Sequence, residues 1–137
     1  KKSLKKNYKT IIVERSMFTD KMVFAKMLYD DGNMEEVEYT IYNKWFDEFI
    51  GDFPQINVIY VKTSPEIAKE RVEKRGRVGE TIPIEYLRNC HKYHEDWLNT
   101  EDKSYDKKIV IHGDTDIDKN PLTNAEWLVT CEKFISS

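Results

Sequence analysis

Three short runs of apolar residues constrain the fold of this chain more than any other feature. They occupy residues 10–14, 58–62 and 108–112, are rich in Ile and Val, and have polar residues on both sides. Continuous β-branched runs of this length are typical of strands that are buried on both faces. Helical patterns separate the three runs, and strands that alternate with helices form right-handed crossovers in a parallel sheet. The sequence therefore predicts an α/β fold in three layers, with a parallel sheet between flanking helices.

Capping residues, apolar periodicity and breakers indicate where the helices begin and end. Ser16 or Thr19 can cap the first helix, and Ser64 can cap a helix that has Pro65 at its first position. Gly76 then ends that helix. The predicted helices span residues 16–31, 34–50, 65–75, 82–98 and 121–135.

Length and charge limit the classes of partner. The chain has 137 residues, which we interpret as one domain over residues 1–137. Because 22 Lys and Arg face 25 Asp and Glu, the formal charge is -3, which disfavours charge-driven binding to nucleic acid or to an anionic membrane. No apolar run approaches the roughly 20 residues of a membrane span. Two cysteines favour a reducing compartment, so we expect a cytoplasmic protein, with a mitochondrial transit peptide in residues 1–9 as the alternative.

The first candidate site follows the predicted strand over residues 10–14. Glu14 ends that run, Arg15 and Ser16 follow at once, and Asp20 lies one to two helical turns further on. In a parallel sheet, ligands bind outside the carboxyl ends of the strands, so these polar groups are expected at one crevice. The alternative is an exposed strand end with a capping serine and a surface ion pair.

The second candidate site is a cluster of arginines. Arg71 and Arg75 are four residues apart and share one helix face, while Gly76 lets the chain turn so that Arg77 can point back toward the same space. Three guanidinium groups can surround the phosphates of a nucleotide, because phosphoryl transfer depends on holding those phosphates and stabilising their charge. We expect the three arginines to share a pocket with Glu14. The alternative is a solvated helix with exchangeable ion pairs.

Together these segments resemble the deoxyribonucleoside kinase family, which includes deoxycytidine, deoxyguanosine and deoxyadenosine kinases. The matching segments occur in the family's order and cover roughly residues 8–118; they are residues 13–20, 41–45, 60–66, 71–87 and 94–98. The resemblance implies a nucleoside kinase-type fold and ATP-dependent phosphorylation of the 5'-hydroxyl of a deoxyribonucleoside. A thymidylate-kinase-like nucleotide kinase and a non-catalytic nucleotide-binding module are the alternatives.

The resemblance also implies roles in phosphoryl transfer. Glu14 would help to hold Mg²⁺, usually through water, and Arg15 would orient the 5'-hydroxyl and the catalytic carboxylate. Arg71 and Arg77 would clamp the transferred phosphates of ATP. Arg75 would stack on the donor base or assist that clamp, and residues 75–81 would form a lid.

Further roles concern the sugar and the two bases. By the resemblance, Glu80 would accept a hydrogen bond from the sugar 3'-hydroxyl, and Asp116 and Ile117 would contact the adenine of the donor. Asp20 matches the position where members that act on cytosine or purine nucleosides keep an aspartate. Because a carboxylate can accept hydrogen bonds from an exocyclic amino group, we expect a substrate with an amino-bearing base.

The chain departs from the family in one large respect. Members carry a phosphate-binding loop of the form GxxxxGKS/T, and the five glycines of this chain nowhere form it. The chain therefore resembles the C-terminal two-thirds of a kinase, without the N-terminal strand and phosphate loop, and we expect this fragment alone to be inactive. In the family sheet, the strand before that loop lies between those that match residues 11–14 and 58–61. We therefore predict that these two runs do not pair directly.

One apolar stripe points to assembly. Val37, Ile41, Trp45 and Phe49 recur at steps of four in the second predicted helix, which indicates a face for the core or for a partner. The family resemblance places a two-fold contact in this part of the chain. We therefore expect a homodimer.

Overall fold

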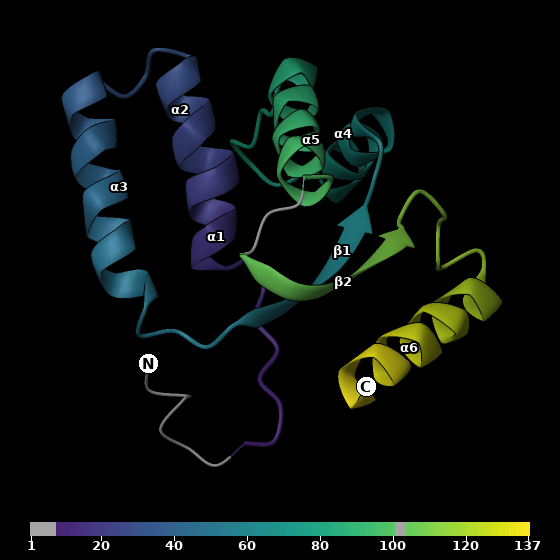
Figure 1. Cartoon of the computed structure of the whole chain (residues 1–137). Helices are drawn as coiled ribbons and strands as arrows, with labels where there is room; N and C mark the ends of the chain where they lie inside the picture. The colour runs from purple at the N-terminus through teal and green to yellow at the C-terminus, as the bar shows by residue number, and fades with distance from the viewer. Residues whose placement is uncertain (1–7, 101–103) are drawn as a thin grey trace.

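The computed structural model describes residues 8–100 and 104–137. Over residues 56–136 a strand, two helices, a second strand and a last helix follow one another, as Figure 1 shows. None of the helices in the described ranges is long and apolar enough to cross a membrane. The elements are α1 (Met17–Thr19), η2 (Asp20–Ala25), α2 (Lys26–Asp30), α3 (Glu36–Ile50), β1 (Ile56–Lys62), α4 (Pro65–Arg75), α5 (Ile84–Leu98), β2 (Tyr105–His112) and α6 (Pro121–Ser136).

The two strands pair in parallel, as the sequence predicts. The register runs from Val58 opposite Lys108 to Lys62 opposite His112, with an irregularity between Ile56 and Val58. The chain between β1 and β2 contains α4 and α5, so the connection is a helical crossover.

The prediction of a third strand at residues 10–14 is wrong. This segment is irregular, and Ile12 and Val13 are 74% and 67% exposed. A strand requires a neighbouring backbone to satisfy its N–H and C=O groups, and within residues 8–100 and 104–137 β1 pairs only with β2. The separate prediction that residues 11–14 and 58–61 do not pair directly is confirmed, since no ladder joins them.

The first predicted helix forms as three consecutive segments with a π-helical centre. Ser16 caps α1 through a capping box, in which its hydroxyl accepts a hydrogen bond from the Thr19 N–H at 3.2 Å. The π-helical η2 follows directly and contains Asp20, and α2 completes the helix up to Asp30. π-Helical turns are rare and occur frequently at functional sites.

The core lies between this first helical stretch, α5 and one face of the strands. Val23 and Met27 pack there with Tyr93, Trp97 and Leu98, which are all at most 8% exposed. Strand residues Val58, Tyr60 and Tyr105 pack against this cluster. Figure 1 shows α1, α2, α3 and α5 on one side of the strands and α6 on the other.

The apolar stripe of α3 is exposed to solvent. Val37, Ile41, Trp45 and Phe49 are between 39% and 62% exposed, whereas Phe46 is the buried residue of this helix. The sequence predicts that this stripe faces either the core or a partner. The core interpretation is therefore wrong within this chain. The stripe is free to contact a partner.

Candidate functional site

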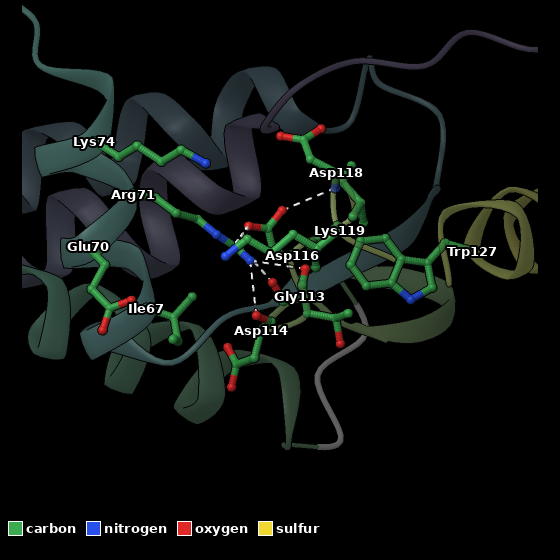
Figure 2. Close-up of a pocket in the computed structure, with 13 residues that line it drawn as sticks. Ile67, Glu70, Arg71, Lys74, Gly113, Asp114, Asp116, Asp118, Lys119 and Trp127 are labelled. Carbon is green, nitrogen blue, oxygen red and sulfur yellow. Dashed lines mark hydrogen bonds and ion pairs between the residues drawn. The ribbon is translucent and has the colours of Figure 1, made fainter. Parts of the chain in front are cut away.

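A cavity of about 640 Å³ lies where β1 and β2 end. Its walls come from α4, from the loop after β2 and from α6, as Figure 2 shows. Ligands of open parallel sheets bind in this position, outside the carboxyl ends of the strands. The residues that line it are Val61, Ile67, Glu70, Arg71, Lys74, Gly113, Asp114, Thr115, Asp116, Ile117, Asp118, Lys119 and Trp127.

Arg71 reaches from α4 to the loop after β2. One terminal nitrogen, Nη1, donates to the Gly113 carbonyl at 2.7 Å. The other, Nη2, donates to the carbonyls of Asp114 and Thr115 at 3.1 Å and 3.2 Å. The planar guanidinium group thus holds three successive backbone oxygens, which a single ammonium group cannot match.

The same loop is fastened to the end of β1. The Gly113 N–H donates to the Lys62 carbonyl at 2.7 Å, and an Asp114 carboxylate oxygen accepts from the Ser64 N–H at 2.7 Å. A Cβ atom on Gly113 would lie only 2.6 Å from the Thr63 hydroxyl and 2.8 Å from a Val61 methyl group. This close approach of two backbones explains why a glycine follows β2.

The two arginines of the predicted lid, Arg75 and Arg77, do not line the cavity. Gly76 adopts the left-handed conformation with φ of 59° and ends α4, so the chain leaves the helix direction at this residue. Arg75 forms a bidentate ion pair with Glu80, with Nη2 at 2.6 Å from Oε1. Arg77 lies beyond this turn and is exposed.

Arg15 occupies a strained position beside the core. Its φ is 63°, which is uncommon for a residue other than glycine. The guanidinium carbon lies 4.8 Å from the centroid of the Phe24 ring, a cation–π contact. Burial lowers the pKa of His94, and the positive charge of Arg15 lowers it further, while burial raises the pKa of Cys90.

Asp20 stands at the start of the π-helical segment. Its carboxylate accepts a hydrogen bond from the Tyr42 hydroxyl of α3 at 2.7 Å. Burial and this hydrogen bond raise the pKa of Tyr42, so the phenol stays a donor. The carboxylate of Asp20 is thereby held in place with further lone pairs available as acceptors.

The cavity does not bring Arg71, Arg75, Arg77 and Glu14 together. Of these residues, only Arg71 lines the cavity. Arg75 pairs with Glu80, and Arg77 follows the left-handed turn at Gly76. Glu14 is exposed on the irregular segment, since no strand holds it at the sheet edge. The individual roles of these residues stay predictions.

Lys74 and Trp127 are among the cavity residues that sequence reasoning missed. Lys74 lies three residues after Arg71 and so shares its helix face, a spacing that could have indicated it. Trp127 comes from α6, where no motif singles it out. Asp116 and Ile117, to which the family resemblance gives a contact with the donor base, line the cavity.

The arrangement of the described side chains limits how a metal ion can bind. Within residues 8–100 and 104–137, no three His, Cys, Asp or Glu side chains gather as a metal-binding group. A Mg²⁺ ion that accompanies a nucleotide needs only one or two protein carboxylates, because phosphates and water supply the other ligands. A single carboxylate such as Glu14 fits that requirement.

Comparisons with known proteins decide the family. The family model described as deoxynucleoside kinase matches residues 1–136. The chain belongs to the deoxynucleoside kinase family. The probable deoxycytidine kinase of Fowlpox virus is 39% identical over 141 residues, which cover 98% of this chain and 59% of that protein. Human mitochondrial thymidine kinase 2 is 38% identical over 90 residues, which cover 64% of this chain and 34% of that protein.

A solved structure shows the same family fold. Deoxyadenosine kinase from M. mycoides with bound dATP is 26% identical to this chain and matches it with a TM-score of 0.72. The match covers 93% of this chain and 67% of that structure. The chain spans about three fifths of the length of the Fowlpox virus protein and about a third of the length of thymidine kinase 2. The sequence-based assignment to this family and to an α/β nucleoside kinase-type fold is confirmed.

Proposed function

We propose that this chain is the part of a deoxynucleoside kinase that binds the phosphate donor and the deoxynucleoside, for transfer of a phosphoryl group from ATP to the 5'-hydroxyl. The observation that supports this most directly is the cavity at the carboxyl ends of β1 and β2, lined by Asp116 and Ile117. These are the residues that the family resemblance assigns to the donor adenine. A kinase needs such a cavity because binding the donor base positions the phosphates in line with the acceptor.

Arg15 is proposed to orient the 5'-hydroxyl and the catalytic carboxylate, and Arg77 is proposed to clamp the transferred phosphates. Both are exposed guanidinium groups, and an arginine can offer two parallel N–H donors to phosphate oxygens. Mg²⁺, with Glu14 as a protein ligand, would neutralise charge on the phosphates of ATP. Glu80, now paired with Arg75, would accept the 3'-hydroxyl of the sugar, so substrate binding exchanges one partner of this carboxylate for another.

Substitution of these arginines tests the proposal in the longest natural form of the protein that contains these 137 residues. We expect Arg15→Ala and Arg77→Ala each to lower kcat for deoxynucleoside phosphorylation by two orders of magnitude or more, roughly the scale of a lost charge-stabilising donor. Arg88→Ala is the matched control, because Arg88 pairs with Glu66 and Glu85 on α4 and α5 away from the cavity. Near-normal turnover in both test variants would contradict the proposal.

The base preference is proposed to depend on Asp20. Its carboxylate, held by Tyr42, can accept a hydrogen bond from an exocyclic amino group, whereas a thymine carbonyl would leave it without a donor. We propose deoxycytidine or a purine deoxynucleoside as substrate. The measurement is kcat/KM for deoxycytidine, deoxyadenosine, deoxyguanosine and thymidine. Asp20→Ala should lower the preference for amino-bearing bases over thymidine at least tenfold, and an unchanged preference would refute this role.

We propose that two copies associate through the exposed stripe of α3. The stripe comprises Val37, Ile41, Trp45 and Phe49, a contiguous apolar face on a helix that has only Phe46 buried. Sedimentation equilibrium of the longest form should give the mass of a dimer, and Ile41→Lys should give that of a monomer. Val129→Lys, on the apolar but separate surface of α6, is the control. A wild-type monomer would contradict the proposal.

A further inference from the structure

The hydrogen bonds of Arg71 connect two parts of the chain that are far apart in sequence. The Arg71 guanidinium on α4 donates to the carbonyls of Gly113, Asp114 and Thr115, which lie 42 to 44 residues later. All three partners are neutral backbone oxygens of one loop. Such bonds from a charged donor are stronger than those between neutral groups. Arg71 therefore fixes the backbone path of this loop.

The loop is held by two further contacts at its start. Gly113 donates to the Lys62 carbonyl, and Asp114 accepts from the N–H of Ser64, the residue that precedes α4. Three independent contacts thus join the end of β1, the end of β2 and α4. Figure 2 shows the Arg71 side chain at the centre of this junction, with its dashed contacts to the loop.

The residues that follow this junction form one wall of the cavity. Asp116, Ile117 and Asp118 come directly after the three carbonyls, and Trp127 on α6 lines the same cavity. The position of the carboxylates in this wall depends on the backbone path just before them. A displacement of about 1 Å in such a loop is enough to impair a binding site.

We propose that Arg71 is a positioning residue that shapes the donor-base cavity by holding the loop after β2, and is not a ligand of the phosphates. This inference rests on the proposed function for the identity of the donor as ATP. The contacts to three carbonyls engage both terminal nitrogens of Arg71, so a bidentate clamp on a phosphate through Nη1 and Nη2 would compete with these hydrogen bonds and loosen the path of the loop. Arg77 follows Gly76 and is exposed, so binding a phosphate would not require it to give up such a set of hydrogen bonds.

Amide hydrogen exchange in the ligand-free chain tests the positioning role without reference to any substrate. The probes are the amides of Ser64 and Gly113, which the junction protects by hydrogen bonds. We expect Arg71→Gln to speed their exchange about tenfold or more, and to leave the Asn99 amide at the end of α5 unchanged. Lys74→Gln, from the same face of α4, is the control and should alter neither probe.

Two outcomes would overturn the positioning role in this experiment. One is unchanged protection of Ser64 and Gly113 in Arg71→Gln, and the other is equal loss of protection in Lys74→Gln. If Arg71→Gln fails to fold, Arg71→Lys replaces it, because a lysine keeps the charge but cannot span three carbonyls. Arg71→Lys is then expected to show the faster exchange at both probes.

Binding and kinetics in the longest form of the protein separate the two roles of Arg71. A positioning residue predicts that Arg71→Lys weakens adenosine and ATP binding by the same factor, about tenfold, and raises KM for ATP with kcat and KM for the deoxynucleoside nearly unchanged. Weaker binding of ATP with unchanged binding of adenosine would identify a phosphate ligand and overturn the inference. A wild-type protein that binds neither ligand would refute the proposed function, while amide exchange would still decide the role of Arg71.

Discussion

Replacement of Gly113 by alanine is the most direct perturbation of the junction between β1 and the loop after β2. The added methyl group would lie 2.6 Å from the Thr63 hydroxyl oxygen, 2.8 Å from Val61 Cγ1 and 3.3 Å from the Lys62 carbonyl oxygen. All three distances are below ordinary van der Waals separation, and one neighbour is backbone. The two strand ends must therefore move apart, which would weaken the hydrogen bond from Gly113 to Lys62.

The cost can be estimated from this crowding. Extra carbon atoms in a packed site typically destabilise a protein by about 1–3 kcal/mol. With a urea dependence of about 2 kcal/mol per molar, the midpoint of unfolding should fall by about 0.5–1.5 M. Equilibrium urea denaturation followed by circular dichroism measures this shift directly.

Gly51 provides the matched control. It ends α3 with φ of -59°, and a Cβ there would meet nothing within 4 Å. Gly51→Ala should leave the free energy of unfolding unchanged or raise it by less than about 1 kcal/mol, so the urea midpoint should not fall. Thr63→Ala combined with Gly113→Ala should recover part of the loss, because it removes the nearest atom. Equal midpoints for Gly113→Ala and Gly51→Ala would refute the steric reasoning.

Three further predictions concern stability. Ser16→Ala removes the cap of α1 and should cost about 1 kcal/mol in urea denaturation, with Ser136→Ala at the end of α6 as a neutral control. Tyr93→Phe removes the 2.6 Å hydrogen bond from the Tyr93 hydroxyl to Asp30 and should lower the free energy of unfolding by about 1 kcal/mol. This bond is charge-assisted only while Asp30 is ionised. A smaller loss of stability at pH 7 than at pH 3 would therefore contradict the prediction. Burial lowers the pKa of His94 below its ordinary value of 6.5, so the unfolded chain binds the proton more readily than the folded chain. The contribution of the neutral His94 to the free energy of unfolding should be fully present above about pH 6.5 and should decrease as the pH falls below it. His94→Asn should flatten that part of the pH profile, and an unchanged slope would show that His94 does not cause it.

Local sequence signals were sufficient for much of the fold. The helix α4 has the predicted bounds because Ser64 and Pro65 start it and Gly76 can adopt the left-handed conformation that ends it. The strands β1 and β2 form where the apolar runs lie, since each provides the other with a paired backbone. The first helix begins at the predicted cap, Ser16.

The failed predictions depend on partners that local sequence does not contain. The run at residues 10–14 has the composition of a strand, but strand formation requires a neighbouring backbone, and within the described ranges it has none. The direction of Arg71 is set by carbonyls more than 40 residues away, and Trp127 reaches the cavity only because α6 folds back beside the loop. Arg75 turns to Glu80 five residues later, a competing partner that the spacing did contain.

The π-helical turn of η2 gives the first helix an unusual tolerance to changes in length. A π turn holds one residue more than an α-helical path requires, and each residue rotates an α-helix by about 100°. Deletion of a single codon within residues 20–25 could therefore be absorbed by conversion to a regular helix, with Val23 or its replacement still directed into the core. The same deletion in the middle of α5 would rotate the residues after it by about 100° relative to those before it. Tyr93 and Trp97 would then no longer both face the core. Homologous chains that differ by one residue between Ser16 and Lys26 would be the natural record of such an exchange.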